Sequence, residues 1–203
     1  MENWFFKRLQ KWRDRRAEVA RGLDCYDMES RVFPLVSKRI QKAGDLTKRD
    51  VLLILKWKTP SFKKSYSQTV SDDNMFKINK AVRGAGKADG EIEALKALDE
   101  VPEIGLPVAS AILTVCYPHK FTILDIRLLG MLALYPARLK SNKPSEPAVE
   151  QWTAEEYWNE FVPAVQQRSK YWGCSLRNAD RALWGLSVAN EVDDTIRISR
   201  QQK

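Results

Sequence analysis

A short turn containing proline and glycine constrains the fold of this chain more than any other feature. It reads DEVPEIG and separates two helical patterns, EIEALKAL at residues 91–98 and LPVASAILTVCY at residues 106–117. Gly105 closes the turn, and Pro107 falls in the first turn of the second helix, where a missing N–H is tolerated. The sequence therefore predicts a hairpin of two helices over about residues 91–116.

The remainder of the chain also predicts helices, because apolar residues recur at helical spacing and β signals are scarce. Thr47 and Asp50 form a capping pattern at the start of one helix. Pro34 interrupts or bends an earlier helix, and Pro163 lies inside a later one. The polar tail, residues 191–203, is expected to fray. The predicted fold class is all-α.

Chain length and cysteine spacing argue against a protein that depends on disulfides or bound metals for its fold. A chain of 203 residues can bury a core without covalent or metal cross-links. Its three cysteines, Cys25, Cys116 and Cys174, are far apart and form no CxxC pair. That pattern argues against disulfide frameworks, zinc ribbons and iron–sulfur clusters. No signal-peptide pattern and no membrane-spanning apolar run occur, so the reducing cytoplasm is the expected location.

Basic residues are unevenly distributed along the chain. The formal net charge is +8, and residues 38–87 hold 13 basic side chains and four acidic ones. Such a concentration favours a polyanionic partner, because each neutralised phosphate releases counterions. A solvated basic surface without a partner is the alternative.

A single aspartate follows the predicted hairpin. Asp125 precedes the helical pattern IRLLGMLALY, so it stands where a helix N-cap would. The start of the hairpin's second helix offers N–H groups that can bind an anion, and a DNA phosphate is the natural occupant in a basic protein. Gly105 would let that phosphate approach the backbone closely.

Together, the hairpin, its small-residue helix and the trailing aspartate resemble the helix-hairpin-helix Gly/Pro/Asp superfamily of DNA glycosylases. The stretch IGLPVASAILTVCYPHKFTILD is most similar to the adenine mismatch glycosylases and the endonuclease III relatives, and the similarity covers about 35 residues. It implies a two-lobed helical fold that binds double-stranded DNA across a cleft, flips the target nucleotide out of the stack and acts in base-excision repair.

The resemblance assigns catalysis to Asp125. Cleavage of an N-glycosidic bond develops positive charge on the sugar, which a carboxylate can stabilise while it activates water. The alternative is that Asp125 only caps a helix, and the two roles are compatible. The resemblance also places the DNA backbone against the hairpin residues Glu103, Ile104, Gly105, Leu106 and Pro107.

This sequence departs from the family at three places. Bifunctional members carry a lysine where Pro107 stands, and it forms a Schiff base with the sugar, so a monofunctional hydrolase is expected here. Lys120, five residues before Asp125, is the alternative source of such a lysine. Glu103 replaces a turn glycine and would repel a phosphate. Only Cys174 lies in the C-terminal third, so no iron–sulfur cluster is expected. No organic or metal cofactor is implied, but the resemblance allows a monovalent cation on the hairpin carbonyls.

The segment LLILKWKTPSF matches the part of the family that intrudes into DNA and lines the base pocket. Lys56, Trp57 and Lys58 stand there, so Trp57 is expected to stack on a base while the lysines contact phosphates. Alternatively, Trp57 is a core residue. Arg127 is a further candidate for a phosphate contact. Leu53 replaces the glutamate of adenine glycosylases, so adenine opposite damaged guanine is not the expected substrate.

Two late helices supply simpler expectations. Arg177, Asp180 and Arg181 share one helical turn and predict local ion pairs. The aromatic residues there fall at helical spacing and are predicted to lie in the core: Tyr157, Trp158, Trp172 and Trp184.

The leading hypothesis is a monomeric, monofunctional DNA glycosylase. Residues 47–120 would form one lobe, and residues 1–46 with 121–203 would form the other. The second hypothesis is a nucleic-acid-binding module that kept the scaffold and lost activity, and RNA remains open as its partner. A third is peripheral membrane binding through the basic helix NWFFKRLQKWRDRR, although no membrane partner is expected.

Overall fold

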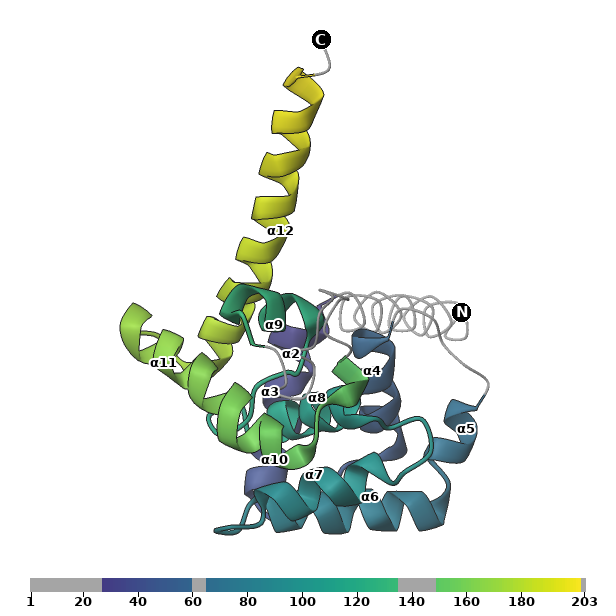
Figure 1. The fold of residues 1–203 in the computed structure, drawn as a ribbon. Helices are drawn as coiled ribbons and strands as arrows, with labels where there is room; N and C mark the ends of the chain where they lie inside the picture. The colour runs from purple at the N-terminus through teal and green to yellow at the C-terminus, as the bar shows by residue number, and fades with distance from the viewer. Residues whose placement is uncertain (1–26, 60–64, 135–148, 202–203) are drawn as a thin grey trace, which may run out of the picture.

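The computed structural model describes residues 27–59, 65–134 and 149–201, and within these ranges every regular element is helical (Figure 1). The all-α prediction is therefore confirmed. The third hypothesis concerns a segment that lies outside the described residues. Among the described helices, none has the length and apolar character that a membrane span requires.

Most consecutive helices are joined by short connections; the longer stretch between Leu132 and Val149 includes residues 135–148, which lie outside the described ranges. The helices are α2 (Met28–Arg31), α3 (Phe33–Gln41), α4 (Lys48–Lys58), α5 (Tyr66–Thr69), α6 (Asp72–Ala85), α7 (Glu91–Asp99), α8 (Leu106–Cys116), α9 (Ile126–Leu132), a 3-10 turn (Val149–Gln151), α10 (Ala154–Glu156), a π-helix (Tyr157–Phe161), α11 (Val162–Trp172) and α12 (Leu176–Gln201).

Local sequence signals set several of these boundaries. Thr47 caps α4 by accepting a hydrogen bond from the Asp50 N–H, and the Asp50 carboxylate accepts one from the Thr47 N–H in return. Val32 separates α2 from α3, so that Pro34 lies in the first turn of α3. Pro163 does not end its helix, because the π-helix precedes it and Pro163 falls in the first turn of α11.

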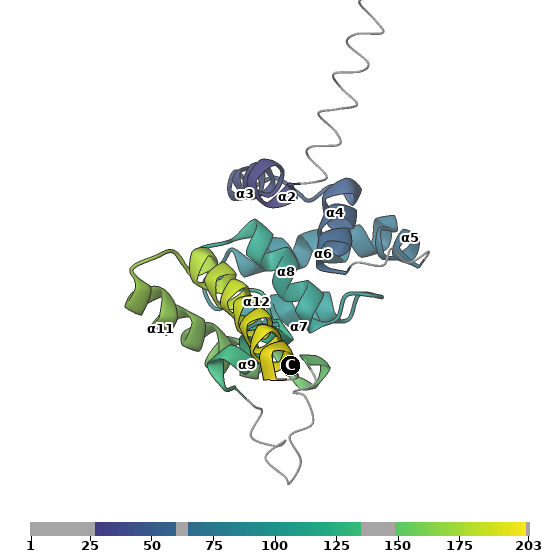
Figure 2. The same cartoon turned by 90° about the horizontal axis from the view of Figure 1, so that it is seen from above.

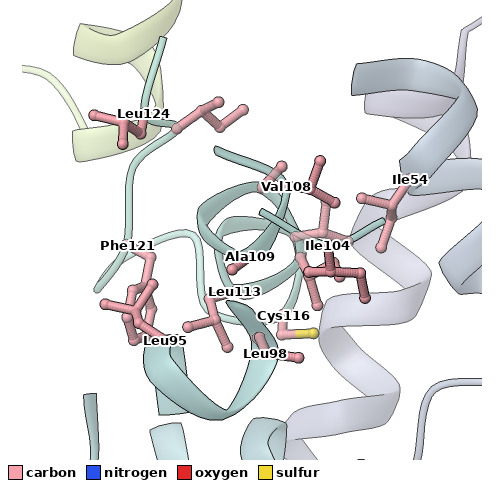
Figure 3. Packing of buried hydrophobic residues seen from close by; sticks show 14 of the residues in the cluster. Ile54, Leu95, Leu98, Ile104, Val108, Ala109, Leu113, Cys116, Phe121 and Leu124 are labelled. Atoms are coloured by element: carbon pink, nitrogen blue, oxygen red, sulfur yellow. The ribbon is translucent and has the colours of Figure 1, made fainter. Parts of the chain in front are cut away.

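The hairpin predicted over residues 91–116 forms as α7, a turn and α8, and α8 is the central helix of the fold. Every residue of α8 except Pro107 is buried. Figure 2 shows α8 between α3 on one side and α7 on the other. Figure 3 shows the resulting core, in which Ile54 of α4 lies beside Ile104 and Val108. Leu98 of α7 lies near Leu113 and Cys116 of α8. Close packing fixes α8 and the chain on either side of it.

Helix α12 differs from the others because its second half leaves the body of the molecule (Figure 1). The tail that was expected to fray from residue 191 is helical as far as Gln201. No glycine or proline follows Gly185 in this helix to end it, and Arg197 pairs with Asp194 one turn earlier at 3.0 Å. Its residues from 190 to 198 are exposed, including the apolar Val192, Ile196 and Ile198.

Candidate functional site

The segment that leads to Asp125 is irregular, so its backbone is held by side chains rather than by a helix. The Tyr157 hydroxyl accepts a hydrogen bond from the Thr122 N–H at 3.2 Å and donates one to the Thr122 carbonyl at 2.6 Å. Complete burial raises the pKa of Tyr157 far above its ordinary value of 10, so this phenol remains a donor at physiological pH. The π-helix thereby fixes the chain three residues before Asp125.

The next two residues are held by helices that lie on either side of the segment. The Ile123 N–H donates to Asp180 of α12 at 3.1 Å, and the Leu124 N–H donates to the Ser110 hydroxyl of α8 at 2.9 Å. Ser110 is therefore more than a small packing residue. Because three separate elements bind three consecutive residues, the position of the Asp125 backbone is tightly determined.

Asp180 is a buried carboxyl group, only 3% exposed. Burial raises its pKa, while the neighbouring Arg177 and the Ile123 N–H oppose that shift. The ion pair with Arg177 is 2.7 Å long, which confirms the local pairing expected within this turn of α12. Asp180 thus connects the Asp125 segment to the basic side chains of α12.

Asp125 is the N-cap of α9, as the sequence predicts. Its Oδ1 accepts the Arg127 N–H at 3.0 Å, while its Oδ2 accepts the Lys58 ammonium group at 2.8 Å. The two side chains are only 22% and 15% exposed, respectively. One carboxylate oxygen therefore holds the helix, and the other forms an ion pair at the wall of a pocket. The cap and a chemical role are structurally compatible.

Lys58 is the last residue of α4, and the end of that helix is anchored. The Thr59 hydroxyl donates to the Leu55 carbonyl at 2.5 Å and shares a 2.6 Å hydrogen bond with the Tyr66 hydroxyl. Tyr66 is fully buried. Lys58 consequently approaches Asp125 from a rigid helix end rather than from a mobile loop.

A pocket of about 420 Å³ opens beside this ion pair. It combines acidic, basic and aromatic side chains from α2, α4, the Asp125 segment and α12. The lining residues are Glu29, Trp57, Lys58, Ile123, Asp125, Arg177, Asp180, Arg181 and Trp184. Three positive and three negative side chains face a volume that suits a small planar ligand with polar edges.

Two tryptophans supply the aromatic part of the wall. The half-buried Trp57 packs edge-to-face with Phe33, with the two ring centres 4.9 Å apart. The Arg177 guanidinium lies 5.5 Å from the centre of the Trp57 ring. Trp184 is 47% exposed, and the Arg127 guanidinium lies over its ring, 5.6 Å from the ring centre. The prediction of a core position is therefore confirmed for Tyr157 and wrong for Trp172 and Trp184, which are 37% and 47% exposed. Trp158 is partly buried against the core.

The hairpin turn has a different character. Glu103, at the position of the family's turn glycine, has φ +66°, the left-handed conformation that glycine adopts without strain. Gly105, in contrast, has φ −79°, and a Cβ there would meet nothing nearer than Pro107 Cδ at 3.8 Å. The side chains of Ile104 and Leu106 are buried, so only their main-chain groups could meet a phosphate.

Acidic side chains surround the N-terminus of α8. The Asp99 carboxylate accepts the Leu106 N–H, and burial raises its pKa despite that hydrogen bond. Glu100 and Glu103 are exposed beside it. An incoming phosphate would compete with a resident carboxylate for one N–H and would be repelled by two others.

The structure thus divides the predicted site residues into two groups. Asp125, Trp57 and Lys58 meet in the pocket. Arg127 lies beside it, pairs with Glu191 at 2.6 Å and donates to Ser187 at 3.3 Å. The exposed Lys56 and the hairpin residues, listed above, are not part of the pocket wall.

Sequence reasoning missed the contributions of Glu29, Arg181 and Trp184. The sequence predicts local ion pairs in the turn that contains Arg177 and Arg181. Arg177 does pair with Asp180 and binds Glu29 of α2 as well, whereas Arg181 pairs with Glu29. No sequence signal marks Trp184 as a pocket residue, because α12 has no amphipathic pattern that would separate an exposed face from a buried one. No sequence signal connects Glu29 with α12, because they are brought together only by tertiary packing.

No group of three or more histidine, cysteine or acidic side chains suited to a metal ion occurs in the described part of the chain. No family model matches the chain, and no curated protein or solved structure is significantly similar to it. Function is therefore inferred from the residues of the site.

Proposed function

We propose that this chain is a DNA glycosylase-like enzyme that hydrolyses the N-glycosidic bond of a flipped, damaged or mispaired base. The observation that carries the proposal is the Asp125 carboxylate, held at 2.8 Å from the Lys58 ammonium group at the wall of an aromatic pocket. A flipped base would lie between the tryptophan rings of this pocket, and its sugar would face Asp125.

The reaction follows from the chemistry of one positioned carboxylate. As the bond between C1′ and the base breaks, its electron pair leaves with the base and positive charge develops on the sugar. Asp125 stabilises that charge and accepts a proton from the attacking water, whose oxygen forms the new bond to C1′. Because Pro107 replaces the hairpin lysine, we propose that water is the nucleophile and that base release is monofunctional.

We also propose the two-lobed arrangement of the glycosylase superfamily for this chain. The pocket draws Trp57 and Lys58 from residues 47–120 and the rest of its wall from the other proposed lobe. A site between lobes is where duplex DNA can present a flipped nucleotide. The basic excess over residues 38–87 supports DNA as the partner and a cellular role in base-excision repair.

Lys58 favours a second candidate activity, cleavage of abasic DNA. After transfer of its proton to Asp125, the amine could add to the C1′ aldehyde of an opened abasic sugar and expel water to form an imine. Removal of a C2′ proton would then let the electron pair expel the 3′-phosphate and cut the strand. Only the short distance between Lys58 and Asp125 supports this candidate.

A panel of duplexes tests the proposal. Each duplex carries one lesion or mismatch, such as uracil, hypoxanthine, or an alkylated or oxidised purine, and products are separated with and without alkali. We expect the protein to release one class of base, with strand breaks appearing only after alkali. Lys58→Met is measured alongside, and borohydride trapping on a preformed abasic site tests for the imine.

The outcomes separate three functions. Alkali-dependent breaks establish the hydrolase, whereas a borohydride-trapped complex that Lys58→Met abolishes establishes abasic-site cleavage. If no lesion is cut and nothing is trapped, but Asp125→Asn and wild type bind duplex DNA equally, the chain is the binding module of the alternative hypothesis and Asp125 is only a cap.

A further inference from the structure

Glu29 occupies an arginine clamp beside the Asp125 pocket. The Arg177 Nη2 lies 3.0 Å from Glu29 Oε2, and the Arg181 Nη2 lies 2.6 Å from the same oxygen. The Arg181 Nε donates to it as well, at 2.7 Å. Three N–H groups from two arginines thus converge on a single carboxylate oxygen. A phosphate, which offers several oxygens, satisfies such a convergence better than one carboxylate oxygen does.

Replacing the Glu29 carboxylate by a phosphodiester would preserve the balance of charges around the two arginines. Arg177 and Arg181 are offset by Asp180 and Glu29, and Asp27, the N-cap of the helix that carries Glu29, adds a weaker attraction to Arg181. If Glu29 leaves, Asp180 remains in its buried ion pair, and a net single positive charge faces the pocket. A phosphodiester group carries one negative charge, so it can replace Glu29 charge for charge.

The helix that carries Glu29 is weakly attached. Helix α2 is only four residues long and contributes no buried residue to the core. Met28 packs against the core only partly, and the clamp supplies the ion pairs between α2 and α12. Displacement of Glu29 therefore disturbs little packing.

We propose that Arg177 and Arg181 form a phosphate site and that Glu29 is its resident substitute, displaced when a DNA phosphodiester binds. Glu29, Arg177 and Arg181 line the same pocket as Asp125, and Trp57 lies against Arg177. The site would hold the backbone phosphate next to the flipped nucleotide while the base contacts the tryptophan wall. Glu29 lowers the affinity for DNA, because its ion pairs must break before the phosphate enters.

This inference rests on the proposed function only in taking DNA as the partner, because it concerns binding and not base release. Its test is the affinity of the full chain for an undamaged labelled duplex at fixed salt, measured by fluorescence anisotropy. Glu29→Gln keeps the size of the side chain and removes its charge. Glu155→Gln is the matched control, since it removes the same charge from an ion pair with Lys96 that is 2.6 Å long and lies outside the pocket.

We expect Glu29→Gln to raise affinity about fivefold and Glu155→Gln to change it less than twofold. Arg181→Gln should lower affinity about threefold, and Glu29→Gln should then add a gain of less than about twofold, because only Arg177 is released. Equal effects of the two glutamate variants, or an undiminished gain without Arg181, would overturn the proposal. A failed glycosylase assay would leave these four affinities unaffected.

Competition identifies the source of the phosphate. Inorganic phosphate and a deoxynucleoside monophosphate are titrated against the labelled duplex, with chloride at the same ionic strength as the reference. We expect both to compete only weakly, because neither makes the neighbouring backbone contacts. If Glu29→Gln strengthens binding of the mononucleotide and leaves duplex binding unchanged, the site belongs to a free nucleotide and the DNA assignment is wrong.

Discussion

The hairpin and the Asp125 pocket are both sites where a DNA phosphate could bind, yet their charges are arranged in opposite ways. At the hairpin, the Asp99 carboxylate already accepts an N–H of α8, and Glu103 carries a further negative charge beside it. At the pocket, positive side chains are present but each has an acidic partner, such as Lys58 with Asp125 and Arg181 with Glu29. The hairpin opposes a phosphate, whereas the pocket can exchange a carboxylate for one.

This difference teaches that the two regions have separate duties. The hairpin places α8 in the core and thereby positions Ser110 under the Asp125 segment. The pocket supplies the groups that could bind and react. Substitutions in the two regions should therefore have unequal effects on stability and on DNA binding.

Asp180→Ala should lower the free energy of unfolding by about 3 kcal/mol. It removes the buried partner of Arg177, which keeps Glu29 as its remaining acidic contact, and it leaves the Ile123 N–H without its acceptor. Asp99→Ala, at the exposed hairpin carboxylate, should cost about 1 kcal/mol as a lost cap. Urea denaturation measures both. Equal losses would show that the pocket is no more tightly built than the hairpin.

Asp180 should also contribute more than Asp99 to the pH dependence of the free energy of unfolding. Burial raises the pKa of both Asp180 and Asp99 above 3.8, so the folded state binds their protons more tightly than the unfolded chain does. The stabilisation from those protons is present below pH 3.8 and is lost as the pH rises through the folded-state pKa. Wild type should therefore lose stability relative to Asp180→Asn on going upward from pH 3.8.

Wild type should also lose stability relative to Asp99→Asn as the pH rises. This loss should be smaller than the one relative to Asp180→Asn, because Asp99 is mostly exposed. Denaturation at a series of pH values, with each variant compared to wild type at the same pH, provides the measurement. A stability difference that grows in favour of wild type with rising pH would contradict the burial of Asp180.

Gly105→Ala should reduce affinity for duplex DNA less than twofold, compared with about threefold for Arg181→Gln. The added Cβ fits without a clash and the backbone conformation suits alanine, so any larger loss would come from the DNA side. Anisotropy titrations of the two variants decide the matter. A tenfold loss for Gly105→Ala would mean that the hairpin grips the DNA backbone after all.

Glu103→Gly should produce the smallest change, raising the melting temperature by about 2 °C because it relieves a left-handed residue. Ala43→Gly is the matched control, since Ala43 is exposed at the end of α3 and has φ +62°. Calorimetry should show similar gains for both variants. A lower melting temperature for Glu103→Gly alone would show that its side-chain interactions outweigh the strain.

How much of this molecule is predictable from sequence depends on the range of the contacts. The Thr47 cap of α4 and the Asp125 cap of α9 involve neighbours two or three residues apart, so residue type and spacing reveal them. The Lys58–Asp125 pair joins residues separated by 67 positions, and the Arg181–Glu29 contact spans 152. Such pairs arise from helix packing, which a single chain's periodicity does not encode.

The direct test of a chemical role for Asp125 is a variant that keeps the cap and removes the carboxylate. Asparagine caps a helix as well as aspartate does, but it gives up the ion pair with the partly exposed Lys58, which is worth no more than about 1 kcal/mol. Asp125→Asn should therefore melt within about 4 °C of wild type. The single-turnover rate of base release, measured with excess protein on the most reactive duplex, should nevertheless fall about 1000-fold. A rate within a few-fold of wild type, at unchanged melting temperature, would show that Asp125 is only a cap and would contradict the catalytic assignment.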